Sequence, residues 1–195
     1  GRLMVIVMDD ALNRDLPLLE PARRIGREIV NRMGPSDLAA VVYTWANQDS
    51  QDFTADRRRL LAAIERLKPG PPAADPRDMD PALGESNFRE ASMRTLEKAS
   101  EYLRSIEGRR KTLFYISVGV PVDWTDIATP IQNLGAEGVT VGGKGAMTHL
   151  GESIGGLLAE AQLANVAVYA LSPRGLTVED HRLEQDFLKS VAENT

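Results

Sequence analysis

Two adjacent aspartates, Asp9 and Asp10, are the residues whose type and position most directly suggest chemistry. They follow the apolar run 3–8, and Asn13 adds a side-chain carbonyl three residues after them. Carboxylate and amide oxygens in such a turn bind a hard divalent cation, or they accept hydrogen bonds from neighbouring backbone amides. The turn DDALNRD has no glycine and carries net negative charge, which disfavours a phosphate.

A second group of candidate residues follows another apolar run, 112–117. Ser117 and Val118 end this run, and the apolar stretch 120–122 then leads to Trp124. In an open α/β sheet, binding sites form beyond the carboxyl ends of the strands, so we expect these residues near the aspartates. We interpret the segment around Trp124 as loop packing, with an exposed recognition patch as the alternative.

The elements that must position these residues alternate between apolar runs and helical patterns. Strands are predicted at 3–8, 38–43, 112–117 and 166–171, a short edge strand at 49–53, and helices at 15–33, 56–67, 87–106, 148–163 and 178–192. Asp15 is expected to cap the first helix. The proline-rich stretch 69–86 and the glycine-rich stretch 118–147 are interpreted as loops. This order predicts an α/β fold with a mainly parallel sheet and helices on both faces.

Composition bounds the class of protein. The chain has 195 residues, of which 43% are hydrophobic and 26% charged, with a net charge of −5 and no cysteine. The charge argues against a nucleic-acid or membrane-surface binder. No apolar run approaches the roughly 20 residues that span a bilayer. The absence of cysteine removes disulfides, thiol nucleophiles and thiolate metal sites.

Three enzyme-like or nucleotide-binding interpretations fit the sequence poorly. A dinucleotide fold needs a glycine-rich turn after the first strand, and a phospho-acceptor receiver needs an aspartate where 43–46 reads Tyr-Thr-Trp-Ala. A hydrolase using Ser117 lacks a Gly-x-Ser-x-Gly elbow and an assignable base. We therefore expect no enzymatic activity.

Several segments in order resemble a von Willebrand factor type A domain. LMVIVMDDALN resembles the family's first strand and loop, where the strand ends in Asp-x-Ser-x-Ser and holds a divalent metal. The other matching segments are SDLAAVVYTWANQDSQDFTADRRRLLAAIERLKPG, YLRSIEGRRKTLFYISVG, ANVAVYALSPRGL and FLKSVAENT. The resemblance covers nearly the whole chain and is closest to a bacterial VWFA-related subgroup whose members are often exported.

The metal-ion-dependent adhesion site that the resemblance implies is degenerate here. If Asp9 is the first aspartate of the motif, Ala11 and Asn13 occupy its two serine positions, and Val118 replaces the aspartate of the central strand. The family's threonine has Ser86 as its nearest match. With so few oxygen ligands we expect no cofactor, and we expect Asp9 to cap the neighbouring turn through backbone amides.

The alternative is an altered Mg²⁺, Ca²⁺ or Mn²⁺ site. It would use Asp9, Asp10 and Asn13, with Asp123 or Asp126 supplying a further carboxylate.

The resemblance implies a single domain, 1–195, with a Rossmann-like three-layer sandwich and one short antiparallel edge strand. The family's last strand would lie beyond Thr195, and an edge left uncovered there would invite a homodimer. The implied function is binding of another protein, without nucleic acid or membrane insertion, through loops 9–15, 69–86 and 118–147. The residues expected in that surface are Asp9, Asp10, Asn13, Ser117, Val118 and Trp124.

Overall fold

The computed structural model describes residues 1–13, 15–70, 81–119, 156, 159–175 and 189. The described strands are β1 (Arg2–Met8), β2 (Leu38–Tyr43), β3 (Gln51–Thr54), β4 (Arg110–Ile116) and β5 (Val166–Leu171). The described helices are α1 (Leu16–Asn31), the short 3-10 turn η1 (Asn47–Asp49), α2 (Arg57–Glu65) and α3 (Pro81–Arg104). Residues 159–164, just before β5, are also helical.

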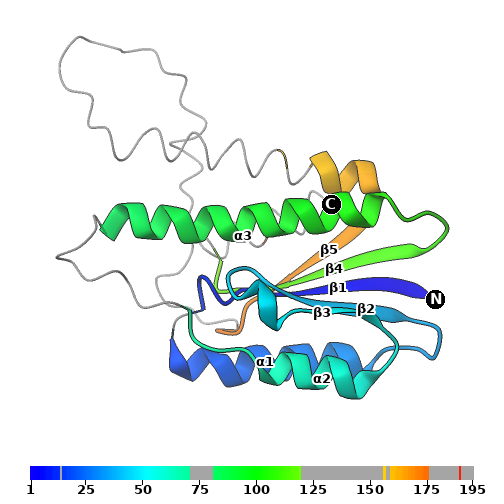
Figure 1. The fold of residues 1–195 in the computed structure, drawn as a ribbon, viewed down its shortest axis with the longest axis horizontal. Coiled ribbons are helices and arrows are strands. Elements are labelled where there is room, and N and C mark those ends of the chain that lie inside the picture. Colours follow the sequence, from blue (N-terminus) through cyan, green and yellow to red (C-terminus); the bar gives the residue numbers. More distant parts are fainter. Residues whose placement is uncertain (14, 71–80, 120–155, 157–158, 176–188, 190–195) are drawn as a thin grey trace, which may run out of the picture.

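The five described strands form one sheet in the order β3-β2-β1-β4-β5. β1 pairs in parallel with β2 and β4, β4 pairs in parallel with β5, and β3 is the antiparallel edge strand. Helix α3 lies on one side of the sheet and α1 and α2 on the other (Figure 1). The predicted α/β class, a mainly parallel sheet with one short antiparallel edge, is confirmed, and it is consistent with a Rossmann-like sandwich of the von Willebrand type A kind.

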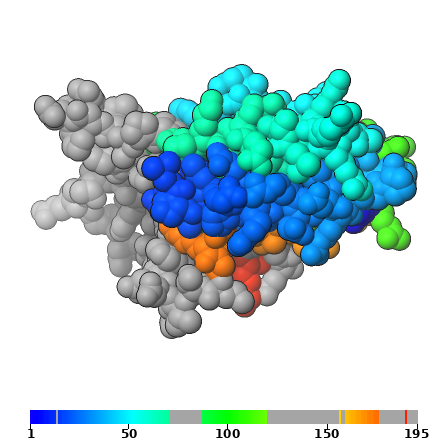
Figure 2. Space-filling view, turned by 90° about the horizontal axis from the view of Figure 1, so that it is seen from below, coloured from blue at the N-terminus to red at the C-terminus, as the bar shows by residue number. Residues whose placement is uncertain are grey.

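The central strand β1 divides its apolar side chains between two cores. Leu3, Val5 and Val7 pack towards α3 and residues 159–164, whereas Met4, Ile6 and Met8 pack towards α1 and α2. The continuous apolar run is therefore the signature of a strand that is covered on both faces. Figure 2 shows α1 and α2 packed side by side over the second core.

Helix boundaries differ from the prediction at two places. Asp15 occupies the position before α1, but its side chain makes no capping hydrogen bond and instead lies 3.7 Å from Arg174. Helix α3 begins at Pro81, so residues 81–86 are helical and not part of a loop. Proline suits a first helical turn because that turn needs no amide donor, and this feature was masked by the surrounding prolines. Asp56, by contrast, caps α2 through the amides of the next turn.

Several predicted features lie wholly or largely outside the described residues: most of the loop 118–147 with the segment around Trp124, the part 71–80 of the loop 69–86, the first part of the helix 148–163, and the helix 178–192 apart from residue 189, which is helical. No described helix combines the length and the apolar character needed to cross a membrane.

Candidate functional site at the carboxyl edge of the sheet

Asp9 lies at the carboxyl edge of the sheet, between the ends of the two strands that flank β1. Met8 is paired with Tyr43 of β2 and with Ile116 of β4, so the next residues along, Thr44 and Ser117, lie on either side of Asp9. Strand alternation turns the Asp9 side chain to the same side as Val7, which is the side of α3.

The Asp9 carboxylate is completely buried and is surrounded by hydrogen-bond donors. Oδ1 accepts bonds from Thr44 Oγ1 (2.8 Å), Ser92 Oγ (2.9 Å) and the backbone amide of Leu12 (3.2 Å), and Oδ2 accepts bonds from Tyr115 OH (2.5 Å) and Ser117 Oγ (2.7 Å). Four of the five donors are hydroxyl groups, and none carries a charge. The expectation that backbone amides hold Asp9 is therefore met by one amide only, that of Leu12.

Opposing effects act on the ionisation of Asp9. Burial raises the pKa of Asp9, because removal from water disfavours the charged carboxylate, while the hydroxyl donors of Tyr115, Ser117, Thr44 and Ser92 act in the opposite direction. The pKa of Tyr115 is raised well above its usual value by burial and by the neighbouring Asp9. Tyr115 therefore stays a protonated donor.

Asp10 performs the capping role that was expected of Asp9. Its Oδ1 accepts a bond from the Trp45 amide and its Oδ2 from the Ala46 amide, both at 2.8 Å, which fixes the turn after β2. Thr44 Oγ1 lies between the two aspartates, 2.8 Å from Asp9 and 3.1 Å from Asp10, and it accepts a bond from the Ala11 amide. One hydroxyl therefore joins both carboxylates to the turn that follows them.

Asn13 and Val118 are brought together, as the resemblance implied. Asn13 is fully buried, and its Oδ1 accepts a bond from the Val118 amide (3.1 Å). Its Nδ2 has no hydrogen-bond partner among the described residues. Ser117 Oγ is buried too and accepts a bond from the Gly119 amide (3.0 Å) while donating to Asp9.

Three residues of this network, Thr44, Ser92 and Tyr115, were missed by the sequence analysis. Their spacing could have indicated them. Tyr115 is two residues before Ser117 and so lies on the same face of the strand, and Ser92 is one helical turn before the inward-facing Leu96. The predicted contributors Trp124, Asp123 and Asp126 lie outside the described residues, as does the side chain of Ser86. Within the described part of the chain, no group of three or more histidine, aspartate or glutamate side chains is arranged to hold a metal ion.

Exposed apolar side chains flank this edge of the sheet. Leu16 begins α1 with 69% of its surface exposed, and Trp45 follows β2 with 48% exposed. Trp45 packs edge-on against Phe88 of α3 with ring centroids 5.0 Å apart. Trp45 is joined to the buried polar network through its backbone amide, which donates to Asp10.

Comparison with known proteins adds little to this geometry. No protein-family model matches the chain, and no curated protein does. Seven chains of solved structures match it. One is the crystal structure of an aerotolerance-related membrane protein from Bacteroides fragilis NCTC 9343 with multiple mutations to serines, with 14% identity over 100% of both chains and a TM-score of 0.38. That similarity is too low to carry an argument about function.

Proposed function

We propose that the chain is a von Willebrand type A-like domain that binds a partner protein through the carboxyl edge of its sheet, without the divalent metal of that family. The observation that carries the proposal is the complete burial of Asp9 with five protein donors on its two oxygens. In such a domain the recognition surface would consist of apolar and polar protein groups instead of a metal ion.

The oxygen atoms at this edge do not fit a divalent cation. Ca²⁺ takes six to eight oxygen ligands, and Mg²⁺ requires six in a near-ideal octahedron. Both carboxylates and the Asn13 carbonyl already accept protein hydrogen bonds, and Ala11 and Val118 have no side-chain ligand atom. Freeing Asp9 would leave several buried hydroxyls without acceptors, at about 1–3 kcal/mol each.

The exposed surface supports a protein partner. Leu16 at the start of α1 and Trp45 after β2 present large exposed apolar side chains. Aromatic anchors surrounded by polar backbone are typical of the energetic centre of a protein–protein interface. The network beneath them holds the turns after β1 and β2 in one conformation, which lowers the entropy lost on binding.

A hydrolytic role for Ser117 has less support. Its Oγ is fully buried, donates to Asp9 and accepts from the Gly119 amide, so a substrate carbonyl has no approach to it. We therefore propose a binding function and no catalysis.

The metal part of the proposal is tested by thermal unfolding with added Mg²⁺, Ca²⁺ or Mn²⁺. A cation that binds only the folded state raises the unfolding midpoint by mass action. We expect no shift at millimolar metal beyond that of a matched ionic-strength control. A metal-specific rise that disappears in Asn13→Leu would favour the altered site built from Asp9, Asp10 and Asn13.

The binding part is tested with three charge-introducing variants at exposed apolar positions. Leu16→Asp and Trp45→Asp alter the proposed surface, and Leu163→Asp is the matched control, because Leu163 is 67% exposed and lies in the helical segment before the amino end of β5. A protein captured specifically by the wild type should be lost by the first two variants and kept by the third. Retention by both edge variants, with loss by Leu163→Asp, would contradict the proposal.

A further inference from the structure

The two faces of the sheet are covered unequally by the described helices. On one face, α2 packs against both β2 and β3, and α1 packs against β1 and β4. On the other face, α3 packs chiefly against β4 and β5. The half of this face formed by β2 and β3 has no helix of its own among the described elements, although a sheet in a three-layer sandwich is normally covered on both sides.

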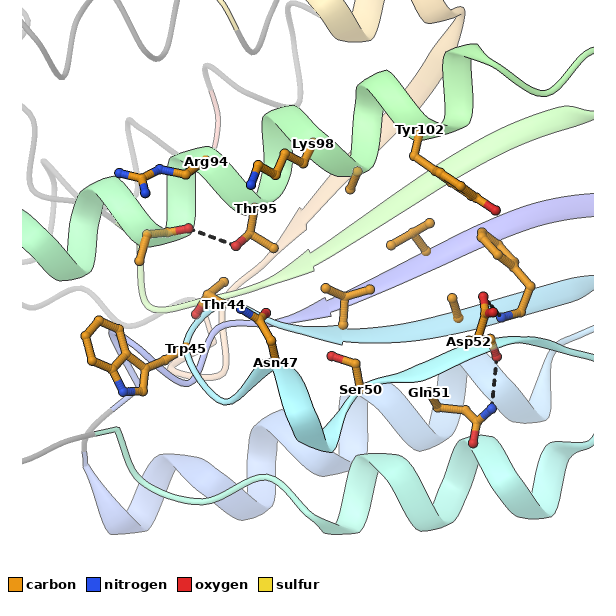
Figure 3. A pocket seen from close by; sticks show the side chains of 16 residues that line it. Thr44, Trp45, Asn47, Ser50, Gln51, Asp52, Arg94, Thr95, Lys98 and Tyr102 are labelled. Atoms are coloured by element: carbon orange, nitrogen blue, oxygen red, sulfur yellow. Dashed lines mark hydrogen bonds between the residues drawn. The ribbon is translucent and has the colours of Figure 1, made fainter.

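A groove of about 830 Å³ occupies this half of the face, between α3 and the β2–β3 hairpin (Figure 3). We call it the side groove. Its floor includes Ala40 and Val42 of β2, and its α3 wall includes Ala91 and Ala99. These short side chains leave room between the helix and the sheet.

Aromatic side chains stand at the two ends of the side groove. Tyr102 stacks on Phe53 at one end, with ring centroids 5.9 Å apart, and Trp45 lies at the other (Figure 3). Tyr102 is 54% exposed. Exposed aromatic rings around an apolar floor are typical of surfaces that receive a partner, because they bury a large area with little loss of side-chain entropy.

The charges along the side groove are asymmetric. Arg94 and Lys98 lie one turn apart on the α3 wall, facing neutral polar side chains of the hairpin, Asn47 and Ser50 (Figure 3). Arg94 is bonded to Glu90, whereas the described residues provide no ion pair for Lys98. The acidic residue of the lining, Asp52, lies towards the Tyr102 end. An occupant with a carboxylate beside Lys98 would complement this wall.

The edge of the sheet is not suited to receive an additional strand. The amide of Phe53 donates to Asp52 Oδ1 (2.7 Å), and Gln51 Nε2 donates to the Asp52 carbonyl (3.0 Å). These bonds engage the Phe53 amide and the Asp52 carbonyl locally, which makes β3 a poorer template for an added strand. An occupant is therefore better accommodated on the face of the sheet, parallel to α3, than along β3.

We propose that the side groove receives an amphipathic helix of a partner protein, with its apolar stripe on Val42, Ala91 and Ala99 and an acidic side chain beside Lys98. Such a helix would cover the half of the face that the described helices leave uncovered, and its acidic side chain would match the charge of Lys98. The site is separate from the carboxyl edge proposed above, although Trp45 borders both. For that reason its test uses no Trp45 variant.

The test is a selection from a displayed library of helical peptides with randomised side chains, using the wild-type chain as bait. Selected peptides are then measured against Lys98→Glu, which reverses the wall charge, and Thr95→Trp, which fills the groove from α3. Lys68→Glu is the matched control, because Lys68 is exposed and lies outside the groove lining. Circular dichroism and the unfolding midpoint establish that each variant is folded.

We expect the selected peptides to carry acidic residues beside an apolar stripe. Their affinity should fall roughly tenfold or more in Lys98→Glu and Thr95→Trp and stay unchanged in Lys68→Glu. The inference is overturned if no peptide discriminates wild type from Thr95→Trp, if the selected peptides are basic or extended, or if wild type self-associates and Thr95→Trp does not. Any of these results leaves the edge surface around Leu16 untouched, so the two proposals fail independently.

Discussion

Two buried serines on the same face of α3 provide a controlled test of the Asp9 network. Ser92 and Ser100 are both fully buried and lie eight residues apart. Ser92 Oγ donates to the Asp9 carboxylate at 2.9 Å, whereas Ser100 Oγ has no hydrogen-bond partner among the described residues. Replacing either serine by alanine removes one oxygen atom from the same helix, so the two substitutions differ chiefly in the bond to Asp9.

The expected difference follows from the loss of one buried hydrogen bond to the Asp9 carboxyl group. Removing one partner of a buried bond costs about 1–3 kcal/mol, and here it leaves Asp9 with four donors. The gain in helix propensity from serine to alanine is shared by both variants and cancels in the comparison. Ser92→Ala should therefore be about 1–3 kcal/mol less stable than Ser100→Ala, which corresponds to roughly 2–12 °C in the unfolding midpoint of a chain of this length.

Urea unfolding followed by circular dichroism measures this difference, with an unchanged m-value as the criterion for comparable folded and unfolded states. Because burial raises the pKa of Asp9, the folded state favours its protonated form, and the stability that Asp9 contributes falls as pH rises from the ordinary carboxyl value through the raised one. The gap between the two variants should narrow as Asp9 becomes protonated, since bonds to neutral acceptors are weaker. Equal stability of Ser92→Ala and Ser100→Ala at neutral pH would refute the network.

The remaining predictions concern an ion pair, a turn cap and a glycine with positive φ. The guanidinium and amide of Arg2 hold the pKa of Asp37 well below its usual range, so Asp37→Asn should cost most stability at neutral pH. The cost, measured by urea titration, should begin to fall as pH drops below about 4, the ordinary carboxyl value, and should be lost only as pH approaches the lowered pKa of the folded state. Asp10→Ala leaves two turn amides, one of them that of Trp45, without their acceptor, and we expect it to lose about 2–5 kcal/mol by chemical denaturation, with little loss contradicting the capping role. Gly108 follows α3 with a φ of +78°, which side chains other than glycine adopt with strain. Gly108→Ala should therefore lower the free energy of unfolding, measured by urea titration, by about 1–2 kcal/mol, and Gly108→Asn should lower it less.

The order of helices and strands was predictable because each strand is a short apolar run and each helix has an apolar stripe. The strand in 112–117 was found nearly at its true bounds, Arg110–Ile116, since it is buried on both faces. The start of α3 was not found, because Pro81 lies among other prolines and no apolar stripe marks residues 81–86. The many prolines suggested a loop, whereas proline is well tolerated in the first turn of a helix, which is where Pro81 lies.

The site was only partly predictable for a different reason. Asp9 and Ser117 were singled out because both end apolar strands, and their contact follows from the parallel register. Ser92 is 83 residues from Asp9 in the chain, and its position depends on where α3 crosses the sheet. The sequence also did not show which aspartate caps the turn after β2 and which accepts the hydroxyl donors. Adjacent residues at a strand end point to opposite sides of the sheet, and only the donors on each side distinguish two residues of the same type.

The local bonds made by Asp52 on β3 have a consequence for how copies of the chain can meet. A sheet extends without limit from molecule to molecule only if it offers two receptive borders. In the described sheet, the Phe53 amide and the Asp52 carbonyl of the β3 border already make local side-chain bonds. Joining through the β5 border would then bring two copies together and leave no matching border for a third. Association by extension of the described sheet should accordingly stop at a dimer and form no filament.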